Sequence, residues 1–184
     1  MTGFILTPGV VPTKLEGPTV FLAGPVHATI DWQSHAIYWL RTMMPHVNVA
    51  TPRNGNIHPD VAHSMYVSAP VSVHMPQYEW ETKYLNEAAR TGVIMFWLAT
   101  EKPDEHECGR SHARTTRYEL AEWKERYIRG EANIVIGAEP GFEGLKYIER
   151  RLAAEAPDLT IWKTLAHTLA AVHDILMNYR FKEV

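Results

Sequence analysis

Apolar residues fall into two kinds of segment along this chain. Short runs rich in apolar and β-branched residues predict strands over residues 19–23, 47–50, 92–99, 133–136 and 159–162. Apolar residues at helical spacing predict helices over about residues 31–44, 77–90, 141–156 and 164–179, and a further helix that begins near residue 114. Because strands and helices alternate, we predict an α/β fold: a five-stranded parallel sheet with helices on both faces, of the flavodoxin-like (Rossmann-like) type.

Two segments fall outside this alternation. Residues 1–18 contain three prolines and three glycines, and we predict an irregular N-terminal lead-in there. Residues 19–184 are then expected to form one domain, since no repeat or linker interrupts them. Residues 52–75 combine several prolines with three histidines and show no period, which is typical of a lid or a binding loop.

Charge and composition narrow the function classes. A net charge of −3 gives no broad attraction to nucleic acid or to an anionic membrane, so we predict neither as a partner. Cys108 is the only cysteine, which excludes an internal disulfide, and its spacing to His106 and His112 matches no standard zinc signature. The first residues lack the basic and apolar regions of a signal peptide, and no run approaches the roughly 18 apolar residues of a membrane span. We therefore expect a cytoplasmic protein.

The loops that follow the first four predicted strands should meet at one edge of the sheet. This carboxyl edge is where open α/β folds bind ligands. Gly24 and Pro25 follow the first strand and form a turn without a large side chain, so a ligand could approach the backbone closely. The same pair is equally typical of an ordinary turn at a strand end.

The segment Arg114–Trp123 follows the third predicted strand and places Glu119 in the first turn of a helix. With Thr116 as the N-cap, Thr116 and Glu119 would form a capping box. The positive end of a helix also favours an ionised carboxylate, which a nucleophile requires. The pattern alone favours the cap and allows the nucleophile.

Glu79 and Glu81, near the start of the helix over residues 77–90, offer a second carboxylate. They lie about 200° apart around a helix, so at most one of them faces a cleft. Two groups near one bond support glycosyl chemistry, because one attacks the anomeric carbon while the other handles the proton of the leaving group. Glutamates in a first helical turn are also typical of a solvated surface.

Arginines and aromatic residues lie beside these carboxylates. Arg110, Arg114 and Arg117 suit either a phosphate near a helix N-terminus or a solvated basic rim. Trp80 and Tyr78 flank the candidate glutamates, and they suit either stacking on a nucleobase or packing in the core.

Four stretches resemble, in order, the nucleoside 2-deoxyribosyltransferase-like family. They are Val20-Phe-Leu-Ala-Gly-Pro25 followed by Asp31-Trp32, Glu79-Trp-Glu-Thr-x-x-Leu85, Gly92-Val-Ile-Met-Phe-Trp97 and Arg114-Thr-Thr-Arg-Tyr-Glu-Leu-Ala-Glu-Trp123. The last stretch is the most specific and resembles the segment that bears the family's nucleophilic glutamate. The resemblance covers about residues 19–172 when the strand and helix order is followed.

This resemblance implies cleavage of the N-glycosidic bond of a nucleoside or nucleotide through a covalent glycosyl-Glu119 intermediate. The deoxyribose would pass to a second nucleobase, or to water in a hydrolase. It also implies a homo-oligomer, dimeric or higher, and we expect no cofactor and no metal ion. Catalytic roles are expected for Glu119, Glu81 and Glu79, and substrate contacts for Gly24, Pro25, Asp31, Trp80, Arg114 and Arg117.

The chain departs from the family pattern at two places. Phe21 stands where the better-known transferases carry a tyrosine whose hydroxyl orients the nucleophile. No acidic residue lies between Gly109 and Tyr118, where those enzymes carry an aspartate. The acid–base role is therefore assigned to Glu81 first and Glu79 second. The same departures favour, as an alternative, a non-catalytic nucleotide-binding module on this scaffold.

Overall fold

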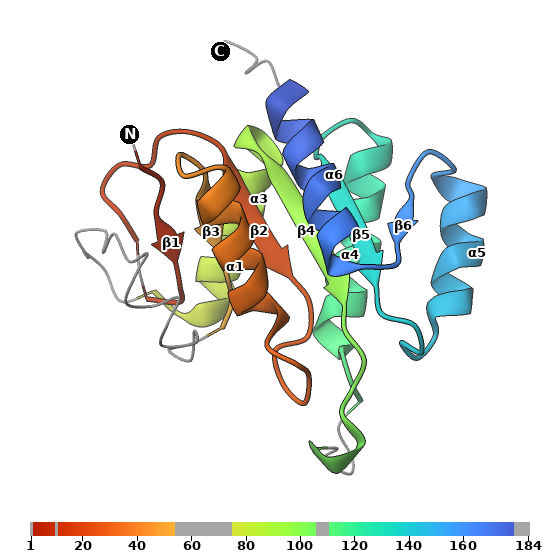
Figure 1. Ribbon diagram of the computed structural model, residues 1–184. Helices are drawn as coiled ribbons and strands as arrows, with labels where there is room; N and C mark the ends of the chain where they lie inside the picture. Colours follow the sequence, from red (N-terminus) through yellow and green to blue (C-terminus); the bar gives the residue numbers. More distant parts are fainter. Residues whose placement is uncertain (1, 10, 54–74, 106–110, 179–184) are drawn as a thin grey trace.

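The computed structural model describes residues 2–9, 11–53, 75–105 and 111–178. Its framework is a parallel sheet with the strand order β1-β3-β2-β4-β5-β6 (Figure 1). The strands are β1 (Ile5–Leu6), β2 (Thr19–Ala23), β3 (Asn48–Ala50), β4 (Val93–Leu98), β5 (Ile134–Ala138) and β6 (Ile161–Trp162). The parallel α/β architecture predicted from the alternation of strands and helices is confirmed.

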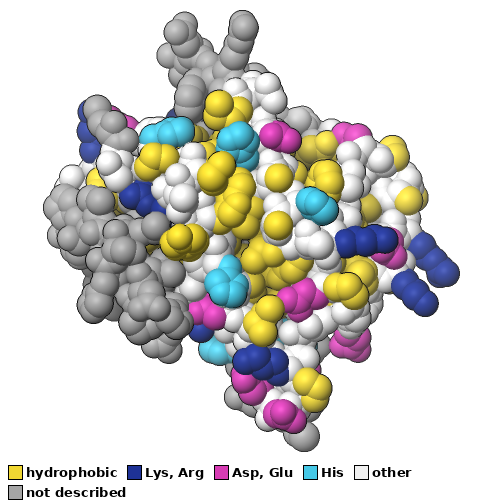
Figure 2. Space-filling model, viewed as in Figure 1, with side chains coloured by type: hydrophobic (Ala, Val, Ile, Leu, Met, Phe, Trp, Pro, Cys, Tyr) yellow, Lys and Arg dark blue, Asp and Glu magenta, His cyan; other side chains and the backbone are white. Residues whose placement is uncertain are grey.

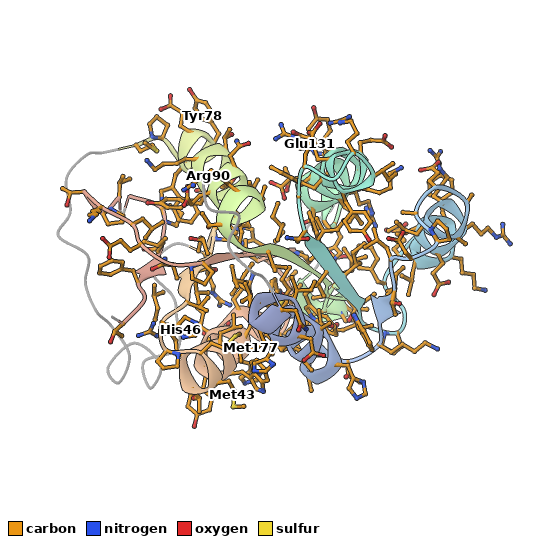
Figure 3. All side chains as sticks on the ribbon, turned by 90° about the horizontal axis from the view of Figure 1, so that it is seen from above. Met43, His46, Tyr78, Arg90, Glu131 and Met177 are labelled. Atoms are coloured by element: carbon orange, nitrogen blue, oxygen red, sulfur yellow. The ribbon has the colours of Figure 1, made fainter. Side chains whose placement is uncertain are left out.

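Helices cover both faces of the sheet. They are α1 (Trp32–Met43), α3 (Gln77–Thr91), α4 (Arg114–Ile128), α5 (Leu145–Glu155) and α6 (Leu165–Asn178), with a short 3₁₀ helix, η1 (Pro103–Glu105). Helices α1 and α6 lie on one face, and α3 and α4 lie on the other (Figures 1 and 3). No helix in the described ranges is long and apolar enough to cross a membrane.

Strand β2 shows how the sequence builds these two layers. All five of its residues are buried, as expected for a central parallel strand covered on both faces. Side chains alternate between the faces, so Val20 and Leu22 pack with α1 while Phe21 and Ala23 pack with α3 and α4. The central strands thus form a rigid base from which the loops at the carboxyl edge extend.

The prediction of five strands is wrong by one, because the lead-in contains the edge strand β1. Ile5 and Leu6 are almost fully buried, and the Leu6 carbonyl accepts a hydrogen bond from the Thr51 amide at 2.9 Å. The Phe4 carbonyl likewise accepts from the Val49 amide at 2.8 Å. Two residues are too few to show a period, so only their pairing with β3 identifies the strand.

Candidate active site

A cavity of about 750 Å³ opens at the carboxyl edge of the sheet. The loops after β2, β3 and β4 line it, together with the first two turns of α3 and α4. The loops after β2 and β4 extend together beyond the ends of their strands at the bottom of Figure 1. This is the position at which open parallel sheets bind ligands, and its volume is in the range of small-molecule sites.

Glu119 lines this pocket from α4 and is partly buried. Burial, together with the smaller effects of the nearby carboxylates of Glu81 and Glu122, raises the pKa of its carboxyl to about 7. No hydrogen bond from a described residue counters this shift. At neutral pH the carboxyl therefore divides between its protonated and ionised forms, which suits a group that alternates between them.

Glu81 is the second carboxylate in the pocket, and it enters from α3. Its Oε1 accepts a hydrogen bond from Gln77 Nε2 at 2.9 Å. Glu79 is exposed, lies outside the pocket lining and accepts a hydrogen bond from the Tyr78 hydroxyl at 2.9 Å. The angular separation of the two glutamates around the helix explains why only one of them lines the pocket.

The predicted capping box at the start of α4 is wrong. The helix begins at Arg114, its N-cap is Ala113, and no side chain caps it. Thr116 is buried inside the first turn, and Glu119 follows in the second turn. The helix dipole acts most strongly in the first turn, and Glu119 lies beyond it. The dipole was expected to stabilise the ionised carboxylate, but the pKa of Glu119 is raised instead.

Two strained backbone positions line the same pocket. Ala28 and Ala113 have φ angles of 52° and 54°, and they are the non-glycine residues with positive φ in the described part of the chain. Such conformations cost about 1–2 kcal/mol per residue and persist only where the surrounding structure enforces them. The Ala28 carbonyl accepts from the Lys102 amide at 2.7 Å, which ties the loop after β2 to the loop after β4. Strain at both loops indicates a preorganised site.

The turn after β2 contributes Gly24 and Pro25 to the pocket lining. A Cβ on Gly24 would lie 2.4 Å from the Trp97 carbonyl oxygen and 2.7 Å from the Trp32 ring, so close packing requires glycine here. The Pro25 carbonyl accepts a hydrogen bond from Trp32 Nε1 at 2.9 Å. The missing side chain thus makes room for Trp32 rather than for a ligand.

The two arginines predicted as substrate contacts differ in position. Arg114 lines the pocket, whereas Arg117 does not. Arg117 donates to the carbonyl oxygens of His112 at 2.7 Å and Glu143 at 2.9 Å, and its guanidinium lies 5.1 Å from the centre of the Phe142 ring. These contacts fasten the start of α4 to the loop after β5, so Arg117 supports the helix that carries Glu119.

Asp31 and Trp80 also lie outside the pocket lining. The Asp31 carboxylate caps α1 through the Ser34 amide at 3.1 Å and pairs with Arg53 at 2.5 Å. Trp80 is fully buried in the core, with its ring centre 4.8 Å from that of Tyr84. The exposed neighbour, Tyr78, is the aromatic residue of α3 that lines the pocket.

Sequence reasoning did not single out several pocket residues. His27, Glu101, Glu105 and Ser111 all line the cavity from loops after β2 and β4. Only their position in the sequence could have identified them, because both loops follow strands that end at the carboxyl edge of the sheet. His112 was considered only as a metal ligand, yet its Nε2 lies 2.9 Å from the Ala99 carbonyl oxygen, as a hydrogen bond requires.

The remaining predictions concern metal and the long loop. Among the described residues, no group of three or more His, Cys, Asp or Glu has the arrangement of a metal site. His106 and Cys108 lie outside the described residues, as do residues 54–74 of the loop predicted to cover the sugar or base. Pro52, at the start of that loop, lines the pocket.

The architecture is therefore that of a parallel α/β protein of the Rossmann or flavodoxin-like type, with a carboxylate-bearing pocket at the expected edge of the sheet. No protein-family model matches the chain, and no curated protein sequence matches it at a significant level.

Proposed function

We propose that this protein cleaves the N-glycosidic bond of (deoxy)nucleosides or nucleotides and transfers the deoxyribosyl group to another nucleobase. The observation that carries the proposal is the pair of carboxyl groups in one pocket, Glu119 with its pKa raised to about 7 and Glu81 close enough to contribute to that shift. Groups whose protonation is balanced near the working pH are characteristic of acid–base and nucleophilic sites. The family resemblance of the segment around Glu119 supports the same chemistry.

In the first half-reaction, the ionised Glu119 carboxylate attacks C1′ of the sugar. The C1′–N bond breaks, its electron pair stays on the ring nitrogen of the base, and the proton that Glu119 gives up passes by way of Glu81 to the departing base. A glycosyl ester on Glu119 results. In the second half-reaction, a ring nitrogen of the acceptor base attacks C1′, Glu81 takes up its proton and Glu119 leaves as a carboxylate.

A second candidate is hydrolysis of the same intermediate. Glu101, Glu105 and His112 bring further polar groups to the pocket, and such groups can orient and deprotonate a water molecule. Transfer requires that water be kept from the covalent intermediate, whereas hydrolysis requires that it be admitted. The two outcomes differ in product and not in the role of Glu119.

Incubation with 2′-deoxynucleosides, with and without a free acceptor base, separates these reactions by chromatography. Transfer gives a new nucleoside only when the acceptor is present, and hydrolysis gives free sugar in either case. We expect intact-protein mass spectrometry to detect one deoxyribosyl group on the wild type and none on Glu119→Ala. Unchanged cleavage by Glu119→Ala would refute the mechanism, and tight nucleotide binding without turnover would identify a binding module instead.

The pH dependence gives an independent check. The step needs Glu119 ionised and one proton left on the Glu119–Glu81 pair for the departing base, so the rate of glycosyl-enzyme formation should fall as the pH rises through about 7, where the pair loses that proton. Single-turnover measurements across this range report the step directly. A rate that is flat through neutrality would separate Glu119 from the reaction.

A further inference from the structure

The loop after β4 brings hydrogen-bond acceptors to the pocket. Glu101 and Glu105 line it with carboxylates, and His112 lines it near the end of the same loop. Lys102 pairs with Glu105 at 2.8 Å and lies outside the pocket lining. Figure 2 shows acidic side chains beside a basic one at the lower end of the molecule, where the loops after β2 and β4 extend in Figure 1. Because ionised carboxylates only accept hydrogen bonds, a ligand that contacts this side of the pocket has to donate them.

His112 adds an acceptor whose identity follows from its own hydrogen bond. Its side chain is 7% exposed, and Nε2 lies 2.9 Å from the Ala99 carbonyl oxygen. A carbonyl oxygen can only accept, so Nε2 carries the hydrogen. In the neutral imidazole, Nδ1 then has a lone pair and no hydrogen. The backbone just after β4 thus determines that Nδ1 is the acceptor.

The Nδ1 atom of His112 faces a second acceptor across a gap. It lies 3.9 Å from Oε1 of Glu101, which also lines the pocket. This distance is longer than a hydrogen bond, so the two atoms are not bonded to each other directly. An atom that carries two hydrogens and lies between them can donate one hydrogen to each. An amino group has this chemistry, whereas a carbonyl oxygen at the same place would meet two acceptors.

The distance along the chain from Glu119 fits a nucleobase between the two sites. His112 precedes Glu119 by seven residues, most of them in α4. A helix rises about 10 Å over that length. With C1′ of the sugar at Glu119, the base extends away from that carboxylate, and its outer edge can reach the acceptor pair. Adenine and cytosine carry their exocyclic amino groups on that edge.

We infer that His112 and Glu101 recognise the exocyclic amino group of the nucleobase, so that the substrates are nucleosides of amino-bearing bases such as adenine and cytosine. The matching oxo bases, hypoxanthine and uracil, present a carbonyl oxygen at the same place. That oxygen would face two acceptors with no hydrogen between them, and a polar site left unpaired in this way rejects a ligand strongly. The inference rests on the proposed function, since it takes the sugar to lie at Glu119.

Steady-state cleavage of matched nucleosides tests this recognition. The pairs are 2′-deoxyadenosine with 2′-deoxyinosine, and 2′-deoxycytidine with 2′-deoxyuridine. The members of each pair differ at the position of the amino group and in the ring nitrogen beside it. We expect kcat/KM of the wild type to be at least about 100-fold higher for the amino member of each pair.

Glu101→Gln separates recognition from the intrinsic reactivity of each base, because glutamine brings an amide donor to the place of a carboxylate. It should slow cleavage of the amino members, speed that of the oxo members and bring each pair within about 10-fold in kcat/KM. The Glu101 side chain is 25% exposed, so the variant should keep its fold, as circular dichroism can verify. Asp104→Asn is the matched control: Asp104 is an exposed acidic residue of the same loop outside the pocket lining, and its substitution should leave the wild-type ratios unchanged.

Calorimetry with the free bases distinguishes failure of this inference from failure of the proposed reaction. Adenine should bind more tightly than hypoxanthine, and cytosine more tightly than uracil, whether or not a nucleoside is cleaved. Equal kcat/KM within each pair, or ratios that Glu101→Gln leaves unchanged, would overturn the recognition and leave the role of Glu119 standing. Absence of any cleavage that depends on Glu119 would refute the proposed reaction, and equal or absent binding of the four bases would then overturn this inference as well.

Discussion

Replacing Glu119 by glutamine should stabilise the protein at alkaline pH and leave its stability unchanged near pH 4.5. Glutamine keeps the size and polarity of the protonated carboxyl but cannot ionise. The carboxyl has a pKa of about 7 in the folded protein and an ordinary value of 4.5 in the unfolded chain. Between these values the unfolded chain ionises while the folded protein keeps its proton. The stability that Glu119 contributes is therefore complete below 4.5 and is lost as the pH rises through about 7.

The magnitude follows from the two pKa values. Each pH unit between 4.5 and about 7 lowers the free energy of unfolding by about 1.4 kcal/mol, so the whole interval corresponds to about 3 kcal/mol. This is a large fraction of the stability of a typical domain. Glu119→Gln removes the ionisation from both states, and its free energy of unfolding should exceed that of the wild type by about this amount above pH 8.

Urea unfolding at a series of pH values measures this difference. The curves of free energy against pH for the wild type and for Glu119→Gln should meet near pH 4.5 and separate steadily up to about pH 8. Glu149→Gln, on an exposed glutamate of α5, serves as the control and should run parallel to the wild type throughout. Parallel curves for Glu119→Gln, or a loss of stability at pH 8, would refute the argument that burial and Glu81 hold a proton on Glu119.

Three further substitutions test the surroundings of Glu119. Glu81→Gln should reduce the kcat of glycosidic cleavage about 100-fold or more, because it removes the group that protonates the departing base. Glu79→Gln, outside the pocket, should leave kcat nearly unchanged. Equal effects of the two substitutions in steady-state kinetics would contradict the acid–base role of Glu81. Arg117→Ala should lower the free energy of unfolding by about 1–2 kcal/mol in urea titrations, because the partly exposed guanidinium donates to two backbone carbonyl oxygens. An unchanged free energy of unfolding would show that Arg117 does not stabilise the start of α4. Ala113→Gly should lower the free energy of unfolding by less than about 1 kcal/mol or raise it, because relief of the positive φ offsets the added flexibility of glycine. The control Ala153→Gly, at an exposed position within α5, should lower it by about 1 kcal/mol. Thermal unfolding of the two variants measures the difference.

Long, strongly patterned segments were predictable from the sequence. The run Gly92–Ala99 has apolar residues without interruption, and it forms the central strand β4, buried at every position. Asp31 was predicted to cap α1, and its carboxylate does accept from the Ser34 amide. Local rules succeeded here because the residues that determine the structure are neighbours in the chain.

Errors arose where a distant partner decides the outcome. Strand β1 exists because Leu6 pairs with the segment that ends β3, more than 40 residues away. At the start of α4, the local pattern favoured Thr116 as the cap, but the N-cap is Ala113, three residues earlier. Arg117 then binds the His112 and Glu143 carbonyl oxygens instead of lining the pocket.

The sequence by itself determined the parallel α/β architecture, and it predicted the edge of the sheet at which a ligand site is expected and Glu119 as the leading carboxylate. It could not determine which of Glu79 and Glu81 faces Glu119, because that depends on how α3 is rotated against the sheet. Only the tertiary structure decided that Glu81 enters the pocket and that Glu119 is buried enough to hold a proton near neutral pH. The physical reason is that pKa values depend on desolvation and on charges brought close in space, and neither can be read from neighbours along the chain.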